Sequence, residues 1–169
     1  MSTKLKIVLD TNCFINAQNN VALSHCAVQE ILKEHENGTI ELYVSRHTLD
    51  ELERKPDAAL GIAKTFPVLP HFPVGTWAEQ VASWDQMEGT WCDAEVNDSV
   101  QQELSKLAKS GNDIRDRGAF LDALRAKADV FVTSDQHLVA NGPAKRIFER
   151  FGLRILSPTQ LLPVIQSRS

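Results

Sequence analysis

Short apolar runs alternate with amphipathic segments along this chain, and the alternation predicts buried strands joined by helices. The apolar runs lie at residues 5–9, 40–44, 129–133 and 153–156. Runs of this length with few polar positions are typical of parallel strands that are buried on both faces. Strands that alternate with helices favour an α/β fold, in which helices cover a mostly parallel sheet. The triplet Asp10-Thr11-Asn12 after the first run is predicted to form a turn.

Helical spacing of apolar residues and capping signals predict the connecting helices. An apolar stripe predicts a helix over 21–36 that ends before Gly38. The segment Thr48-Leu49-Asp50-Glu51 has the pattern of a capping box, which would open the next helix at Thr48. Further helices are predicted over 116–128, over 143–151 and from Ser157-Pro158 onwards.

The pattern changes between about 66 and 110. Pro67, Pro70 and Pro73 fall three residues apart, which favours an extended stretch at its beginning. Helical segments are predicted after these prolines. We therefore expect a single domain over 1–169, with a helical insertion at about 66–110.

Composition and charge narrow the functional classes. The chain has 169 residues, of which 43% are hydrophobic and 24% are charged, the balance of a folded globular protein. A net charge of -4 argues against nucleic-acid binding through bulk positive charge, but it is compatible with an enzyme that recruits cations to an acidic site. The charge is uneven, because residues 141–169 carry five basic side chains and one acidic one.

The cysteines and the hydropathy pattern bear on the compartment. The three cysteines are odd in number and lack a C-x-x-C spacing, which favours a reducing compartment over a disulfide framework or a zinc site. No apolar run approaches the length of a membrane span. We expect a cytoplasmic protein without a membrane association.

Four acidic residues are supplied by separate predicted elements, namely Asp10, Glu51, Asp116 and Asp135. Ligand sites of parallel sheets lie beyond the carboxyl ends of the strands, so these acids have the positions to converge there. Converging carboxylates repel one another, and a bound divalent cation offsets that repulsion. Because no Cys or His joins the set, oxygen ligation favours Mg²⁺ or Mn²⁺, as one or two ions. Each acid also has a purely structural interpretation, as a cap, a turn residue or a partner of a helix dipole.

The motifs that carry these acids resemble those of the PIN-domain ribonucleases. The matching segments run in the family's order and reach both ends of the chain: 7–12, 44–52, Asp116 with its helix, 128–135 and 152–158. The combination of Asp-Thr-Asn after the first strand with Ala-Asp-x-x-Val-Thr-x-Asp is fairly specific. The resemblance implies a three-layer α/β/α sandwich around a parallel sheet of four to five strands, and metal-dependent hydrolysis of RNA phosphodiester bonds.

The resemblance also assigns roles to residues. It places Asp10, Glu51, Asp116 and Asp135 in the family's four acidic positions, as catalytic residues and metal ligands. Asn12 and Thr133 would be small polar neighbours that orient ligands or bound water. Asp113 lies one turn before Asp116 on the same predicted helix face and competes with it as the third ligand. The candidates for contacts with RNA phosphates are Arg115, Arg117, Lys145 and Arg146.

The leading hypothesis is therefore a metal-dependent endoribonuclease that acts on RNA. The resemblance extends to the toxins of toxin–antitoxin pairs, for which an antitoxin protein and a homodimer would be partners. One alternative is a non-catalytic regulatory or scaffold module with the same fold. Another is a phosphohydrolase of the haloacid-dehalogenase type, which requires a second Asp two positions after the first; Asn12 occupies that place and argues against it.

Overall fold

The computed structural model describes residues 4–20, 23–54, 57–70, 113–139 and 141–168, and within these ranges it leaves the side chains of 113–117, 137 and 141–143 undescribed. The strands are β1 (Leu5–Leu9), β2 (Ile40–Val44), β3 (Val130–Val132) and β4 (Arg154–Leu156). The described helices are α1 (Thr11–Gln18), α2 (His25–Glu36), α3 (Arg46–Glu53), α4 (Ala58–Ala63), α6 (Asp113–Arg125), α7 (Gln136–Val139), α8 (Asn141–Phe151) and α9 (Pro158–Gln166).

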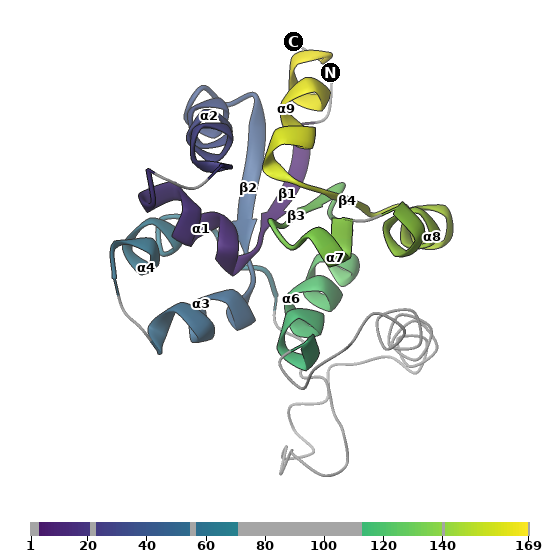
Figure 1. The fold of residues 1–169 in the computed structure, drawn as a ribbon, viewed down its shortest axis with the longest axis horizontal. Helices are drawn as coiled ribbons and strands as arrows, with labels where there is room; N and C mark the ends of the chain where they lie inside the picture. Colours follow the sequence, from purple (N-terminus) through teal and green to yellow (C-terminus); the bar gives the residue numbers. More distant parts are fainter. Residues whose placement is uncertain (1–3, 21–22, 55–56, 71–112, 140, 169) are drawn as a thin grey trace, which may run out of the picture.

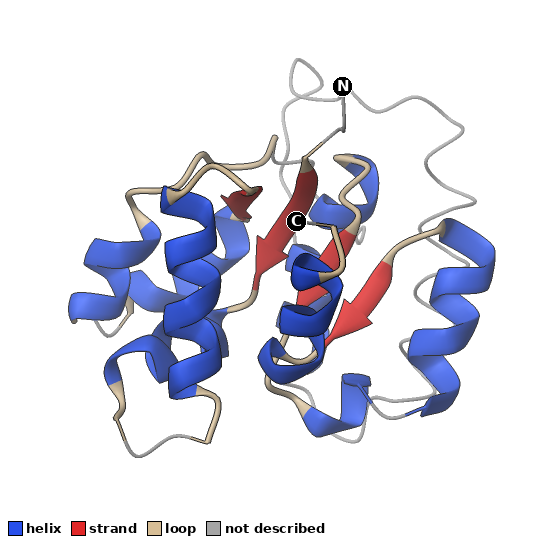
Figure 2. Ribbon diagram, turned by 90° about the horizontal axis from the view of Figure 1, so that it is seen from above, coloured by secondary structure: helices blue, strands red, loops and turns tan. Residues whose placement is uncertain are grey.

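The four strands pair in the order β2-β1-β3-β4, and every pairing is parallel. In the register of the sheet, Leu9 at the end of β1 lies opposite Val44 on one side and Val132 on the other. Helices surround the strands (Figures 1 and 2). The predicted α/β fold, a three-layer arrangement around a parallel sheet of four to five strands, is confirmed, and the described residues form four strands.

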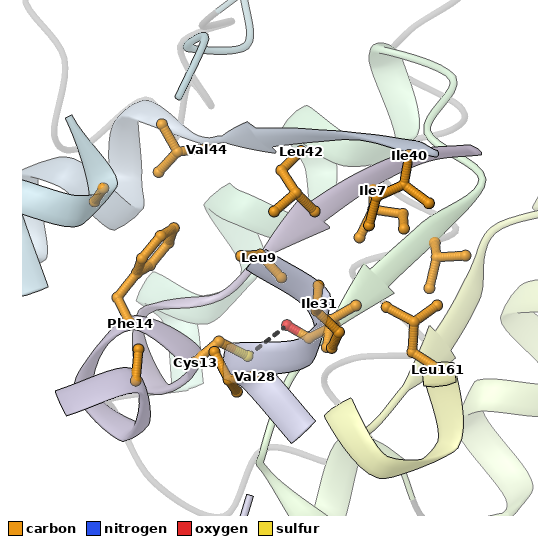
Figure 3. Close-up of a cluster of buried hydrophobic side chains, with 14 of the residues drawn as sticks. Ile7, Leu9, Cys13, Phe14, Val28, Ile31, Ile40, Leu42, Val44 and Leu161 are labelled. Atoms are coloured by element: carbon orange, nitrogen blue, oxygen red, sulfur yellow. Dashed lines mark hydrogen bonds between the residues drawn. The ribbon is translucent and has the colours of Figure 1, made fainter. Parts of the chain in front are cut away.

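Alternate strand residues point to opposite faces of the sheet, so the protein has two hydrophobic cores. On one face, Ile7 and Leu9 of β1 pack with side chains of α1, α2, α4 and α9. On the other face, Val8 and Phe131 pack with side chains of α6 and α8. Figure 3 shows the first core, where the Cys13 Sγ lies 3.4 Å from the backbone oxygen of Val132, to which it donates.

The helix boundaries correct several predictions. The chain enters α1 directly at Thr11, so the predicted turn is wrong: Asp10 is the N-cap of a helix. Helix α3 begins at Arg46 with Ser45 as its N-cap, so the predicted start at Thr48 is also wrong. Helix α6 begins at Asp113, three residues before its predicted start. Helices α4 and α7 were not predicted.

The stretch after Phe66 is extended where the structure describes it, as the proline spacing predicts. Val44 donates from its amide to the Pro67 oxygen over 3.1 Å, and its own oxygen accepts from the Leu69 amide at 2.8 Å. Residues 67–69 therefore continue the sheet beside the end of β2, with a parallel bridge at Val68. Most of the predicted insertion, from 71 to 110, lies outside the described residues. None of the described helices has the length and apolar character to cross a membrane.

Candidate active site at the carboxyl edge of the sheet

The strand order places a topological switch point at the carboxyl end of β1. From β1 the chain crosses first to β2 on one side and later to β3 on the other. Connections that leave in opposite directions open a crevice between two strand ends, which is where parallel sheets bind ligands. Asp10 directly follows β1, and its amide donates to the Val132 oxygen of β3 at 3.0 Å. The carboxylate of Asp10 is thereby positioned by both strands that flank the switch point.

Asp10 is buried, with 4% of its surface exposed, and the protein holds both of its carboxylate oxygens. Its Oδ1 accepts from the amide of Thr11 at 2.8 Å, which is the cap of α1. Its Oδ2 accepts from the Thr133 hydroxyl at 2.8 Å. These two bonds fix the carboxylate in one orientation from opposite sides of the crevice.

The electrostatic surroundings of Asp10 disfavour its charged form. Burial is the main cause that raises the pKa of Asp10 to about 6. The bonds from Thr133 and Thr11 oppose this rise, and the carboxylates of Glu51 and Asp135 add to it. At neutral pH the ionised Asp10 therefore lies in a negative potential, which a cation would relieve.

Glu51 comes to the site from the side of β2. Its Oε2 accepts from the Thr11 hydroxyl at 2.6 Å, so one threonine bonds to Asp10 through its amide and to Glu51 through its side chain. The capping role predicted for Glu51 is wrong. Ser45 caps α3 instead, because its hydroxyl accepts from the Thr48 amide at 3.0 Å. Glu51 lies in the last turn of α3, and its bond to Thr11 turns its carboxylate toward α1.

Asp135 comes to the site from the other side, after β3. Its amide donates to the Thr133 hydroxyl at 3.1 Å, and that hydroxyl donates in turn to Asp10. Asp135 is half-buried, and its charge contributes to the raised pKa of Asp10. The structure thus places the predicted acids Glu51 and Asp135 near enough to Asp10 for their charges to raise its pKa, and it places the predicted neighbour Thr133 between the Asp10 carboxylate and the Asp135 amide.

The other predicted site residues divide into two groups. The backbone of residues 113–117 forms the first turns of α6, but their side chains are outside the described part of the chain, so Asp113, Arg115, Asp116 and Arg117 stay predictions. Asn12 is exposed in the first turn of α1. Lys145 and Arg146 are exposed on α8, away from α3 (Figure 1), and Lys145 pairs with Glu149 at 3.7 Å.

A pocket of about 90 Å³ opens beside Asp10. Its described lining comprises Asp10, Thr11, His47, Thr48, Asp50, Glu51, Arg54 and Ala119. The lining residues come from the starts of α1 and α3, the end of α3 and the second turn of α6. Ala119 is the lining residue that α6 contributes, and it follows Asp116 by three positions along the helix. Sequence reasoning missed Thr11 and Arg54; for Arg54, its spacing of three residues from Glu51 was the available signal.

The donor chemistry of this edge fits a hard divalent cation. Asp10, Glu51 and Asp135 offer oxygen atoms only, and the charges of Glu51 and Asp135 add to the main effect of burial in raising the pKa of Asp10. Among the described side chains, no three acidic, His or Cys residues lie close enough to enclose an ion. Asp116, the fourth predicted ligand, belongs to the first turns of α6, where the side chains are outside the described part of the chain, so its place in a ligand set stays a prediction.

Comparisons with known proteins do not assign the chain to a family, because no family model and no curated protein matches it.

Proposed function

We propose that this protein is a metal-dependent endoribonuclease that hydrolyses RNA phosphodiester bonds with the carboxylates at the edge of its sheet. One observation carries the proposal: a bonded network links Asp10 through Thr11 to Glu51 and through Thr133 to Asp135, at the switch point of a parallel sheet. A buried acid held beside two other acids is the arrangement expected of a cation site. The likeness of the surrounding motifs to PIN-domain ribonucleases supports RNA as the substrate.

The chain's own residues prepare this site before a substrate arrives. Thr11 and Thr133 hold the Asp10 carboxylate in place, and the Thr11 hydroxyl does the same for Glu51. Together with Asp116, these carboxylates and that of Asp135 would hold one or two Mg²⁺ or Mn²⁺ ions. Such ions, when bound, lower the pKa of a water molecule and neutralise charge that develops on phosphate oxygens.

The setting of the protein is part of the same proposal. Cys13 and Cys26 are free thiols, as expected in a reducing compartment, and we place the protein in the cytoplasm. An antitoxin partner and a homodimer follow only from the resemblance to PIN-domain toxins. A small antitoxin reading frame beside the gene would support the toxin role.

The test is an RNA cleavage assay with the full chain. Labelled single-stranded RNA is incubated with the protein in Mg²⁺, in Mn²⁺ and in EDTA, and we expect cleavage only with metal. Asp10→Asn and Glu51→Gln should each lower the rate on the order of 100-fold or more. Glu30→Gln is the matched control, because it removes the same charge from an exposed position on α2 and should keep the activity.

Two outcomes would contradict the proposal. Cleavage that persists in EDTA would exclude the metal-dependent mechanism, and full activity of a folded Asp10→Asn variant would exclude the site. Circular dichroism of each variant shows whether it is folded. If the wild-type protein cleaves no RNA with either metal, the non-catalytic scaffold becomes the favoured interpretation.

A further inference from the structure

The pocket of the candidate site combines acidic side chains with one positively charged side chain, that of Arg54. Among the described residues that line it, Arg54 is the only lysine or arginine, and it faces the same space as Asp10 and Glu51. It follows the last residue of α3 and is exposed. An arginine in an acidic pocket has two obvious uses: to neutralise a neighbouring acid, or to remain available for an anion from outside.

The contacts around Arg54 favour the second use. Arg54 lies three residues after Glu51 and four after Asp50, spacings at which helical ion pairs form readily. Asp50, however, pairs with Arg46 at 2.8 Å, and Glu51 accepts its bond from Thr11. Within the described residues Arg54 forms no ion pair. Its guanidinium is therefore available in the pocket although two acids of its own helix are in reach by sequence.

We infer that Arg54 binds a phosphate of the RNA strand in this pocket, an inference that rests on the proposed function. The carboxylates of Asp10 and Glu51 repel a phosphodiester, and a guanidinium in the same pocket reduces that repulsion. A guanidinium has the planar fork of donors that matches two phosphate oxygens at once. Because Arg54 and Glu51 share the pocket, the bound phosphate lies next to the carboxylates that act on it.

Arg54 also lies at the carboxyl end of α3, where any cation complements the helix dipole. That structural role makes a different prediction. A lysine would replace the arginine without loss, the effect would appear in stability, and RNA binding would not depend on the residue. Phosphate binding instead requires the fork, appears in RNA affinity and changes the dependence on salt.

The experiment measures RNA binding without turnover. The full chain carrying Asp10→Asn binds a labelled single-stranded RNA in Mg²⁺ at several salt concentrations, and fluorescence anisotropy gives the affinity. Adding Arg54→Gln should weaken binding about 10-fold and reduce the slope of log affinity against log salt by about 0.7, the value for one phosphate contact on a single strand. Arg54→Lys should keep most of the slope but recover only part of the affinity.

The matched control is Arg168→Gln, which removes the same charge. Arg168 is exposed and follows α9, a helix that lies away from α3 (Figure 1). It should leave affinity and slope unchanged. A competition with inorganic phosphate distinguishes a site for any phosphate from one that requires the strand. Competition at millimolar concentration that Arg54→Gln abolishes indicates the former, and an Arg54-dependent affinity without such competition indicates the latter.

The outcomes separate this inference from the proposed function. Equal loss in the Arg54→Gln and Arg168→Gln proteins, an unchanged slope in the Arg54→Gln protein, or no RNA binding by the parent overturns the phosphate site. If Arg54→Gln leaves metal-dependent cleavage intact, the phosphate site is excluded and the proposed nuclease activity stands. If RNA binding depends on Arg54 but the wild-type protein cleaves no RNA, the phosphate site stands and the proposed nuclease activity is excluded.

Discussion

Gly118 allows α6 to approach α3 closely, and this contact yields the sharpest prediction about the candidate site. A Cβ atom at Gly118 would lie 2.4 Å from Cδ2 and Nε2 of the His47 ring, and 2.6 Å from its Cε1. Ordinary contacts between carbon atoms are about 3.5–4.0 Å. The ring or the helix would thus have to move by about 1 Å to admit one methyl group, and the His47 Nε2 is already buried.

The expected magnitude follows from two opposing effects. Gly118→Ala should gain about 0.5–1 kcal/mol from better helix propensity, because Gly is the poorer residue inside a helix. Overpacking of this kind costs about 1–3 kcal/mol. We therefore expect Gly118→Ala to lower the free energy of unfolding by about 1–2 kcal/mol. In a His47→Ala background the obstacle is gone, and the same substitution should be neutral or stabilising.

Urea denaturation of four proteins measures this coupling: the wild type, each single variant and the double variant. The double-mutant cycle should give an interaction between the two positions of about 1–3 kcal/mol. An effect of Gly118→Ala that is the same with and without His47 would refute the close contact.

The same four proteins test how the contact positions α6. Asp116 lies two residues before Gly118, so a displacement of about 1 Å in this turn would misplace a predicted metal ligand. A misplacement of that size can reduce catalysis on the order of 100-fold. RNA cleavage by the Gly118→Ala protein should fall accordingly, and His47→Ala in the same chain should restore part of it. A loss that the second substitution does not relieve would show that the displacement has another origin.

Three further predictions concern the network and the cap of α3. Thr133→Val removes the hydroxyl that serves Asp10 and the Asp135 amide, and urea denaturation should show a loss of about 1–3 kcal/mol; an unchanged stability would contradict these bonds. Because the pKa of Asp10 is raised from 3.8 to about 6, the folded protein binds a proton that the unfolded chain has lost between these values. In EDTA the free energy of unfolding should therefore fall by up to about 3 kcal/mol as the pH rises from about 4 to 7, and Asp10→Asn should abolish this part of the pH dependence. Ser45→Ala should cost about 1 kcal/mol in the same assay, whereas no loss would indicate that α3 begins at Thr48 after all.

The strands were predictable because burial on both faces leaves a strong signal. A strand covered by helices on both sides is a continuous apolar run, and the runs at 5–9 and 40–44 give the observed bounds of β1 and β2. Short helices leave a weaker signal. Helix α4 consists largely of small residues without a polar face, and it depends on its cap from Asp57 and on the buried positions Ala59 and Ala63.

The candidate site was predictable in its acids but less so in what holds them. Asp10, Glu51 and Asp135 could be placed near one edge because parallel strands all end there, whereas Asp116 stays a prediction. The role of Thr11 could not be found in this way, since it depends on where two helices begin. Asp10 is the N-cap of α1, so the helix follows the strand without a turn. Ser45 is the N-cap of α3, so Glu51 lies too far along the helix to take part in its cap. Only then do Thr11 and Glu51 lie side by side on facing helices.

The fold requires a helix cap at position 10, but it does not require that the capping residue carry a charge. An asparagine caps a helix as well as an aspartate does, and its amide could serve Thr133 while its oxygen accepts from Thr11. The chain instead buries a carboxylate beside Glu51 and Asp135, which at neutral pH destabilises the fold by an amount that its raised pKa puts at about 3 kcal/mol. Structure alone does not account for a charge in that position. A cation bound at this edge would offset the cost of burying the charge, because the Asp10 carboxylate would then serve as its ligand. Asp10→Asn should therefore make the metal-free protein more stable at neutral pH, and it should also remove the RNA cleavage.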